Sequence, residues 1–304
     1  MVGGGYGTGR EIVQYFTRLG PYGGLYALLV AFSIFALVLS LTFEIGRRFD
    51  AYDYRTFFQI LLGKRWFVYE IVGFFMLMLV FAVVIAAATS VLTDGFDLPA
   101  WIGMILVVGL IGILEFFGRD VVMRVLTLWS LVLYAVFITF LVNVFDTIPE
   151  KISAAFASGG AEADWAISGF QYALYNLMAA PMILYVARNF KTRKHAISAG
   201  VIAAAIAIIP AGIFHVAFSG AEPTTTAADI PVYAMMNAHS MHFLTLAFTI
   251  MLFGTLIETG AGILQGVNER IDSQLKDYQR EPLTKWGHTG VAMGLMVLAL
   301  MVAS

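Results

Sequence analysis

Long apolar runs recur along the whole chain, and they constrain its fold more than any other feature. Runs of membrane-spanning length lie at about residues 25–46, 67–92, 99–117, 121–145, 169–188, 196–219, 241–267 and 286–304. About 20 consecutive apolar residues suffice for a helix to cross the hydrocarbon core of a bilayer. Because lipid cannot satisfy backbone polar groups, such runs must form helices there. We therefore expect an all-α polytopic membrane protein in a single transmembrane domain.

Composition excludes several other classes of function. Only 12% of the residues are charged and the net charge is −2, which gives no electrostatic footprint for nucleic acid. The chain has no cysteine, so disulfides, thiol catalysis and thiolate metal sites are excluded. No recognisable catalytic motif is present, and we expect neither an enzyme nor an organic cofactor. The expected partners are the lipid bilayer and a small solute, while the sequence does not indicate an oligomeric state.

The basic residues predict the orientation of the spans. Fifteen of the 18 Lys and Arg residues fall in alternate loops. These are Arg47, Arg48, Arg55, Lys64, Arg65, Arg119, Arg124, Arg188, Lys191, Arg193, Lys194, Arg270, Lys276, Arg280 and Lys285. By the positive-inside rule these loops are cytoplasmic. The opposite loops hold only Arg18 and Lys151.

The N-terminal stretch predicts a broken helix. Residues 9–19 would rise about 16 Å as a helix, half of a bilayer core that is about 30 Å thick. The glycine-rich residues 3–9 precede it, and glycine allows the backbone to depart from helical geometry. In a membrane protein, non-helical backbone is tolerated only where it is buried in protein or lines a cavity. A flexible, exposed terminus is the alternative. Since a chain cannot begin in mid-membrane, we expect a preceding half-helix and a helix after residues 286–304. The sequence is then either a fragment or starts from a misassigned initiator methionine.

Two further segments have a recognisable pattern. Residues 50–63 have an amphipathic period and are expected to lie flat on the membrane surface. In the run 169–188, Pro181 interrupts the helix shortly after Tyr175 and Asn176.

Three motifs together resemble a known family. The stretch from Gly3 to Ile12, the Tyr175-Asn176-Leu177 triplet, and Glu258-Thr259-Gly260 followed by Asn268-Glu269-Arg270-Ile271 are similar to segments of the YkvI-type bacterial membrane proteins. By fold this family belongs to the amino acid–polyamine–organocation superfamily, and the resemblance implies a bacterial plasma membrane as the location. The resemblance implies a LeuT-like arrangement of two inverted repeats of five helices, in which helices one and six are discontinuous. The repeats would span 1–145 and 169–304, lacking the cytoplasmic half of helix one and all of helix ten. The surface helix 50–63 and the loop 220–240 would be the lateral helices of that fold.

The resemblance places a substrate site where the two broken helices meet at mid-membrane. The residues expected to bind substrate are Gly5, Gly7, Thr8, Gly9, Glu11, Tyr175 and Asn176. Two alternatives remain: Arg10 and Glu11 neutralise each other, or Tyr175 and Asn176 only hydrogen bond between helices.

An ion-coupling site is expected at Gly3, Gly4, Thr255, Glu258 and Thr259. Thr255, Glu258 and Thr259 share one helix face, so they could bind Na⁺, or Glu258 could carry H⁺. A structural hydrogen bond to a neighbouring helix is the alternative for Glu258. Other glutamates near span ends are expected to form surface ion pairs, namely Glu44 with Arg47, Glu70 with Lys64 or Arg65, and Glu115 with Arg119.

The predicted function is secondary active transport of a small, amino-acid-like organic solute, coupled to Na⁺ or H⁺. The alternative is a receptor on the same fold that binds a small ligand without transporting it.

Overall fold

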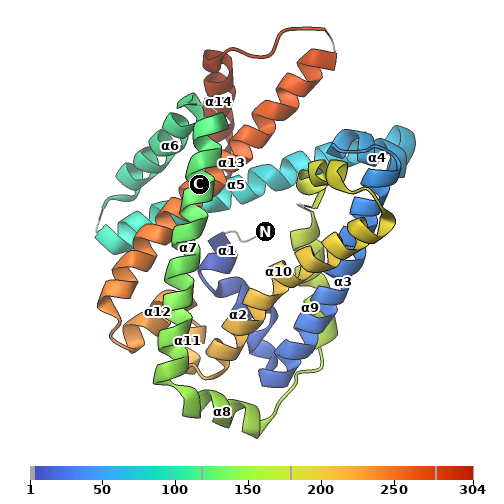
Figure 1. The fold of residues 1–304 in the computed structure, drawn as a ribbon. Helices are drawn as coiled ribbons and strands as arrows, with labels where there is room; N and C mark the ends of the chain where they lie inside the picture. The colour runs from blue at the N-terminus through green and yellow to red at the C-terminus, as the bar shows by residue number, and fades with distance from the viewer. Residues whose placement is uncertain (1–3, 97, 118, 179, 278, 304) are drawn as a thin grey trace. The chain divides into compact units, whose positions relative to one another are not determined.

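The computed structural model describes residues 4–303 apart from 97, 118, 179 and 278, and this part of the chain contains helices and no strand (Figure 1). Within it, five helices are by themselves long and apolar enough to cross a membrane. They are α3 (Pro21–Arg48), α5 (Phe67–Phe96), α6 (Ala100–Phe117), α10 (Arg193–Ser219) and α13 (His242–Asp277). The expected all-α polytopic architecture is therefore confirmed.

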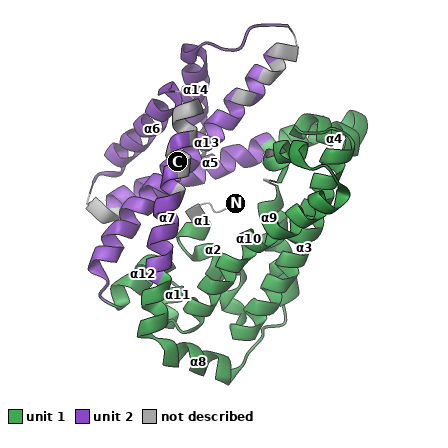
Figure 2. Cartoon of the chain, viewed as in Figure 1, with its two compact units in different colours: residues 1–73, 141–239 green, residues 74–140, 240–304 purple. Residues whose placement is uncertain are grey.

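The chain divides into two compact units, and each combines segments that are distant in sequence (Figure 2). Unit 1 comprises residues 1–73 and 141–239, and unit 2 comprises residues 74–140 and 240–304. Helices α5 and α7 (Arg119–Thr147) run from one unit into the other.

Unit 1 is built around α3 and α10, with α9 packed on α3. The Ser40 hydroxyl of α3 donates to the Ile197 carbonyl of α10 at 3.1 Å. The other elements of unit 1 are α1 (Gly4–Gly7), α2 (Arg10–Tyr15), the 3₁₀ turn η1 (Thr17–Leu19), α4 (Tyr54–Leu62), η2 (Gly63–Arg65), α8 (Pro149–Ser158), α9 (Trp165–Leu177), the 3₁₀ helix η3 (Ala180–Asn189), α11 (Pro223–Thr226) and α12 (Pro231–Ala238).

Unit 2 is formed by α6 and α13 together with α14 (Lys285–Ala303), which packs on both. The indole N–H of Trp129, on α7, donates to the Met251 carbonyl of α13 at 3.0 Å. The polar residues after 267, which lie beyond the expected span 241–267, continue α13 without interruption to Asp277.

The first helix is interrupted at Thr8 and Gly9. Gly9 has φ +81°, a left-handed conformation that L side chains rarely adopt. A Cβ on Gly9 would also approach the Phe218 ring Cζ to 2.7 Å and Val232 Cγ2 to 3.0 Å. Glycine is thus needed here for backbone conformation and for packing. The irregular part of the glycine stretch is narrower than expected, because Gly4–Gly7 already form one helical turn.

The sixth apolar run is interrupted as well. Helix α9 ends at Leu177, and the chain continues from Ala180 to Asn189 as a 3₁₀ helix. Runs of 3₁₀ helix longer than three or four residues are uncommon, and they often mark strain or a hinge. Pro181 lies in the first turn of η3, where its missing N–H breaks the α-helical ladder.

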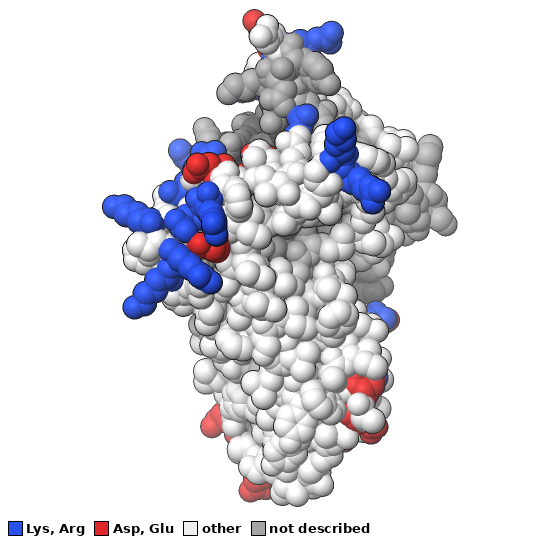
Figure 3. All heavy atoms as spheres, turned by 90° about the vertical axis from the view of Figure 1, so that its right-hand side faces the viewer, with Lys and Arg blue, Asp and Glu red and all other residues white. Residues whose placement is uncertain are grey.

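Charge is segregated along unit 1. On the face drawn in Figure 3, Lys and Arg side chains gather where α3 ends and α10 begins, and acidic side chains gather toward the opposite end. Near that acidic end, Arg18 pairs with Asp164 at 2.8 Å and Lys151 with Glu222 at 2.6 Å. The Lys151 ammonium lowers the pKa of the Glu222 carboxyl by its hydrogen bond. Loops that the charge rule assigns to one side of the membrane are therefore neighbours in unit 1.

The expected surface helix is present as α4. Asp53 caps it by accepting from the Thr56 N–H at 2.9 Å, as N-cap aspartates commonly do. Phe57 is buried against Leu184 and Ala51, whereas Leu61 and Leu62 are exposed. This two-sided character fits a helix that lies at the membrane surface.

Candidate functional site

The break in the first helix is held in place by the segment that contains α11 and α12. The Thr8 carbonyl, which has left the helical ladder, accepts from the Val232 N–H of α12 at 3.2 Å. The Thr8 hydroxyl accepts from the Arg10 N–H at 3.3 Å. Arg10 reaches the same segment, since its guanidinium pairs with Asp229 at 2.9 Å. The alternative in which Arg10 and Glu11 neutralise each other is therefore wrong.

Helix α2 lies against α9, so the two interrupted helices are neighbours. The Ser168 hydroxyl of α9 donates to the Tyr15 carbonyl of α2 at 2.8 Å. The Tyr172 ring packs edge-on against Tyr15 and Phe16, with centroids 5.6 and 4.8 Å apart. These contacts fix the end of α2 against the middle of α9.

Glu11 and Tyr175, two of the predicted substrate residues, come together at this junction. The Glu11 carboxylate is close enough to act electrostatically on the phenol groups of Tyr172 and Tyr175. Glu11 is partly buried, whereas Tyr175 is 49% exposed. Asn176 differs from the prediction in part, because its amide donates to the Tyr172 carbonyl of its own helix at 3.1 Å.

The remaining predicted substrate residues are backbone elements of the first helix. Gly5 and Gly7 lie in α1, and Thr8 and Gly9 form the break itself. Tyr15 and Tyr172 were not among the predicted residues, although both lie within one turn of a predicted one. Their helical spacing from Glu11 and Tyr175 would have indicated them.

The predicted ion-coupling residues fall in different parts of the chain. Gly3 lies outside the described residues, Gly4 begins α1 in unit 1, and the other three lie on α13 in unit 2. The Thr255 hydroxyl donates to the Met251 carbonyl at 2.9 Å, and the Thr259 hydroxyl to the Thr255 carbonyl at 2.8 Å. Each hydroxyl oxygen keeps lone pairs for a ligand. Their assembly into one site with Gly3 and Gly4 stays a prediction.

His215 is a buried polar residue to which the sequence assigned no role. It lies on α10 with no exposed surface, and its Nε2 donates to the Pro21 carbonyl at 2.9 Å. With the proton on Nε2, Nδ1 accepts from the Thr17 hydroxyl at 3.3 Å. Gly24 leaves the space in which the imidazole ring lies. His215 thus ties α10 to the turn between η1 and α3.

The three glutamates expected in surface ion pairs have different surroundings. Glu44 does pair with Arg47, through two hydrogen bonds of 2.8 and 2.7 Å. Glu70 instead accepts from the Tyr54 hydroxyl at 3.1 Å. Glu115 is only 4% exposed, so the expectation of a surface residue was wrong.

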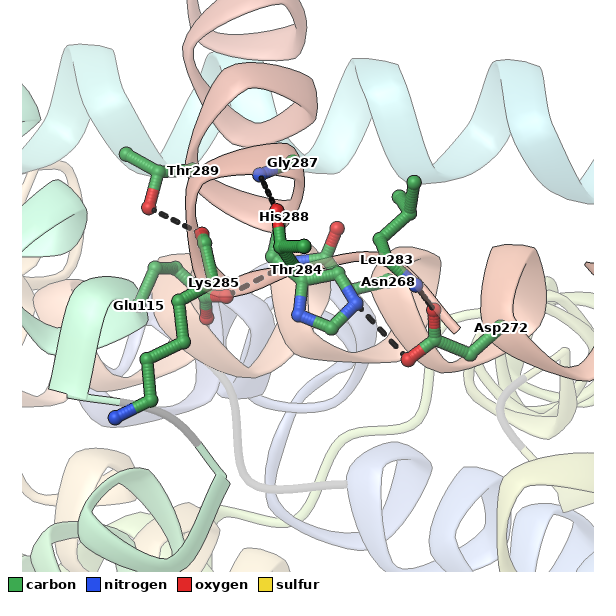
Figure 4. A network of polar contacts seen from close by, with 9 residues as sticks. All are labelled: Glu115, Asn268, Asp272, Leu283, Thr284, Lys285, Gly287, His288 and Thr289. Carbon is green, nitrogen blue, oxygen red and sulfur yellow. Dashed lines mark hydrogen bonds and ion pairs between the residues drawn. The ribbon is translucent and has the colours of Figure 1, made fainter. Parts of the chain in front are cut away.

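Glu115 belongs to a polar network at one end of unit 2 (Figure 4). The Asn268 amide of α13 donates to Glu115 Oε2 at 3.0 Å. One helical turn further on, Asp272 accepts from the Leu283 N–H and contacts His288 Nε2, both at 2.9 Å. The end of α6, the last turns of α13 and the start of α14 therefore meet at this end. No group of three or more His, Cys, Asp or Glu side chains suited to a metal ion occurs among the described residues.

Comparison with known proteins agrees with this architecture. No family model matches the chain. Over 293 residues it is 26% identical to the "Uncharacterized membrane protein YkvI" of Bacillus subtilis (strain 168). That alignment covers 90% of this chain and 79% of the relative. The chain is similar to a YkvI-type membrane protein. The similarity supports the multi-pass membrane architecture, and the relative's name states no activity.

Proposed function

We propose that this protein is a secondary active transporter of a small organic solute, of the class of amino acids and related molecules. The observation that carries the proposal is the junction of two interrupted helices in unit 1. There the Tyr15 ring of α2 packs on the Tyr172 ring of α9 at 5.6 Å, and the Glu11 carboxylate acts electrostatically on Tyr172 and Tyr175. Irregular backbone at membrane depth is tolerated only where it is buried in protein or lines a cavity, and in many transporters it forms the substrate site.

The chemistry of this junction suits a solute that carries an ammonium group. A carboxylate forms strong, charge-assisted hydrogen bonds with an ammonium group, and phenol rings attract cations through their faces. Glu11 offers the first interaction, and Tyr15 and Tyr175 offer the second. Intramembrane carboxylates are costly, which favours a functional role for Glu11.

The proposed coupling ion is Na⁺ or H⁺ at Thr255, Glu258 and Thr259. Glu258 lies in α13 on the same face as the two threonine hydroxyls. The division of the chain into two compact units also supports transport, because alternating access commonly moves one bundle of helices against another.

Uptake into proteoliposomes tests the proposal. We expect accumulation of at least one solute from a panel of amino acids and related molecules when an inward Na⁺ or H⁺ gradient is imposed. Glu11→Gln and Tyr175→Leu, which removes the ring, should each lower uptake at least tenfold, whereas Glu162→Gln, at an exposed loop residue, should leave it unchanged.

Two results would contradict the proposal. One is the absence of gradient-dependent uptake across the whole panel by folded protein. The other is saturable solute binding without flux, which would establish the receptor on this fold instead.

A further inference from the structure

The most unusual polar feature outside the proposed transport site is a pair of unsatisfied oxygens at the buried end of α6. Glu115 and Asn268 have exposed fractions of 4% and 2%. Their one mutual hydrogen bond, from Asn268 Nδ2 to Glu115 Oε2, is 3.0 Å long. Glu115 Oε1 and Asn268 Oδ1 have no hydrogen-bond partner among the described residues.

Both remaining oxygens are hydrogen-bond acceptors, so what the pair lacks is a donor hydrogen. Buried polar groups in proteins nearly always have a hydrogen-bond partner, and a buried carboxylate without one is especially unfavourable. A protonated carboxyl group supplies one O–H donor. A single proton on Glu115 Oε1 would supply that donor, and it would satisfy both oxygens once the carboxyl and amide groups rotate so that Oε1 faces Asn268 Oδ1.

We propose that Glu115 and Asn268 form a proton-binding site, in which the carboxylic acid and the amide make a closed pair of hydrogen bonds. In this pair Asn268 Nδ2 donates to Oε2, and the bound proton on Oε1 donates to Oδ1. Binding adds one proton to the carboxylate and forms one O–H bond, and release reverses both. No other reactant is required.

The geometry favours a proton over a metal cation. Hard cations such as Ca²⁺ and Mg²⁺ are surrounded by six or more oxygens, whereas two free oxygens are available here. No cluster of three or more acidic or histidine side chains supplements them among the described residues. The Asn268 amide also presents N–H groups to the same place, and these would repel a cation.

His288 connects this pair with the surface. Its charge acts on Glu115, and its Nε2 contacts Asp272 at 2.9 Å. Figure 4 draws the imidazole among the residues of this network, with its contact to Asp272 as a dashed line. The side chains of His288 and Asp272 are 26% and 28% exposed, so water can reach this side of the site.

The other charged groups on the helices packed against α6 are few. Among the described side chains they are His242, Glu258, Arg270 and Asp272 on α13, and Lys285 and His288 on α14. Of these, His288 is the group whose charge acts on Glu115.

Infrared difference spectroscopy of the full chain in lipid nanodiscs tests the proposal without any solute or ion gradient. Its result is therefore independent of whether the protein transports. On changing from mildly acidic to alkaline pH, we expect the loss of a protonated carboxyl C=O band. Glu115→Gln should lack that band, and Glu281→Gln, at an exposed loop residue, should retain it.

The reversed pair provides a rescue that a purely structural role would not give. In the double variant Glu115→Gln with Asn268→Asp, the acid and the amide exchange helices, so a pH-sensitive carboxyl band should return. Glu115→Gln alone carries an N–H where the proposal places the O–H, so it should remain folded. Its melting temperature should lose the wild-type decrease with rising pH, a decrease that follows from the proton being held more firmly by the folded chain.

Three results would overturn the proposal. The first is a band that is unchanged in Glu115→Gln. The second is the absence of any protonated carboxyl band in both the wild type and the reversed pair, which would mean that water rather than a proton satisfies the oxygens. The third is loss of the band on adding Na⁺ at constant pH, which would identify a cation site.

Discussion

At the scale of single residues, Gly9 shows which structural features a sequence pattern can predict and which it cannot. The glycine-rich stretch predicted irregular backbone, and the structure has its left-handed residue in that stretch at φ +81°. Its contacts could not be predicted, because Phe218 and Val232 are more than 200 positions away. The conformation follows from local chemistry, whereas the packing follows from the tertiary fold.

Replacing Gly9 by alanine should destabilise the protein. The left-handed conformation costs an L residue about 1–2 kcal/mol, and the added Cβ would be 2.7 Å from the Phe218 ring. Thermal unfolding in detergent should show a clear decrease in melting temperature. The matched control is Gly262→Ala in α13, where no described atom lies within 4 Å of the Cβ position; helix propensity should raise stability there by about 0.5–1 kcal/mol. Equal stability of Gly9→Ala and the wild type would contradict a constrained break.

His215→Ala should also destabilise unit 1. The substitution removes the donor of the Pro21 carbonyl and the acceptor of the Thr17 hydroxyl, and both groups are partly buried. An unsatisfied buried polar group costs about 1–3 kcal/mol, and the cavity adds to this. Chemical unfolding followed by tryptophan fluorescence should measure the loss. His195→Ala, at an exposed position, should change stability little, and a similar small change for His215→Ala would show that its hydrogen bonds are dispensable.

At the scale of elements, the sequence predicted helices better than it predicted how they end. Helix α6 begins one residue from the expected start and ends where expected, because apolar composition is uniform along it. The segment 220–240 was expected as a loop with a lateral-helix role, and it contains α11 and α12. Its hydrogen bond to the Thr8 carbonyl depends on a partner that the local sequence does not reveal.

The start of α14 offers a test at this scale. Asp272 binds the Leu283 N–H and His288, while Thr284 caps the helix through the Gly287 N–H at 3.2 Å. In Asp272→Ala the cap remains but the link to α13 is lost. Hydrogen exchange of the amides at 283–289 should therefore become faster, by at least tenfold, with the rest of α14 unchanged. The exposed Glu281→Ala serves as control, and unchanged exchange in Asp272→Ala would mean that other contacts fix this end.

At the scale of the whole molecule, each unit takes helices from both halves of the sequence. Unit 1 combines residues 1–73 with 141–239, and unit 2 combines 74–140 with 240–304. Apolar periodicity shows that a helix is buried, but not which helix covers it. The Glu115–Asn268 pair illustrates this limit, because its two residues are 153 positions apart. No local spacing could have brought them together.

The alternation of basic loops predicts the sidedness of the whole chain, and the absence of cysteine makes a direct test possible. We expect Lys191→Cys and Glu281→Cys to react with a membrane-impermeant maleimide only after the cells are permeabilised. Ala163→Cys and Ser240→Cys should react in intact cells. All four positions are exposed, so a failure to react reports the membrane rather than burial.

These four positions also sample both units. Lys191 and Ala163 belong to unit 1, and Glu281 and Ser240 to unit 2. The reversed pattern at all four would place the basic loops outside and contradict the positive-inside assignment. A correct pattern in one unit and a reversed pattern in the other would mean that the number of crossings between them is wrong. Because the change would fall between Lys191 and Ser240, it would mean that α10 or the segment 220–240 crosses the membrane differently from the prediction.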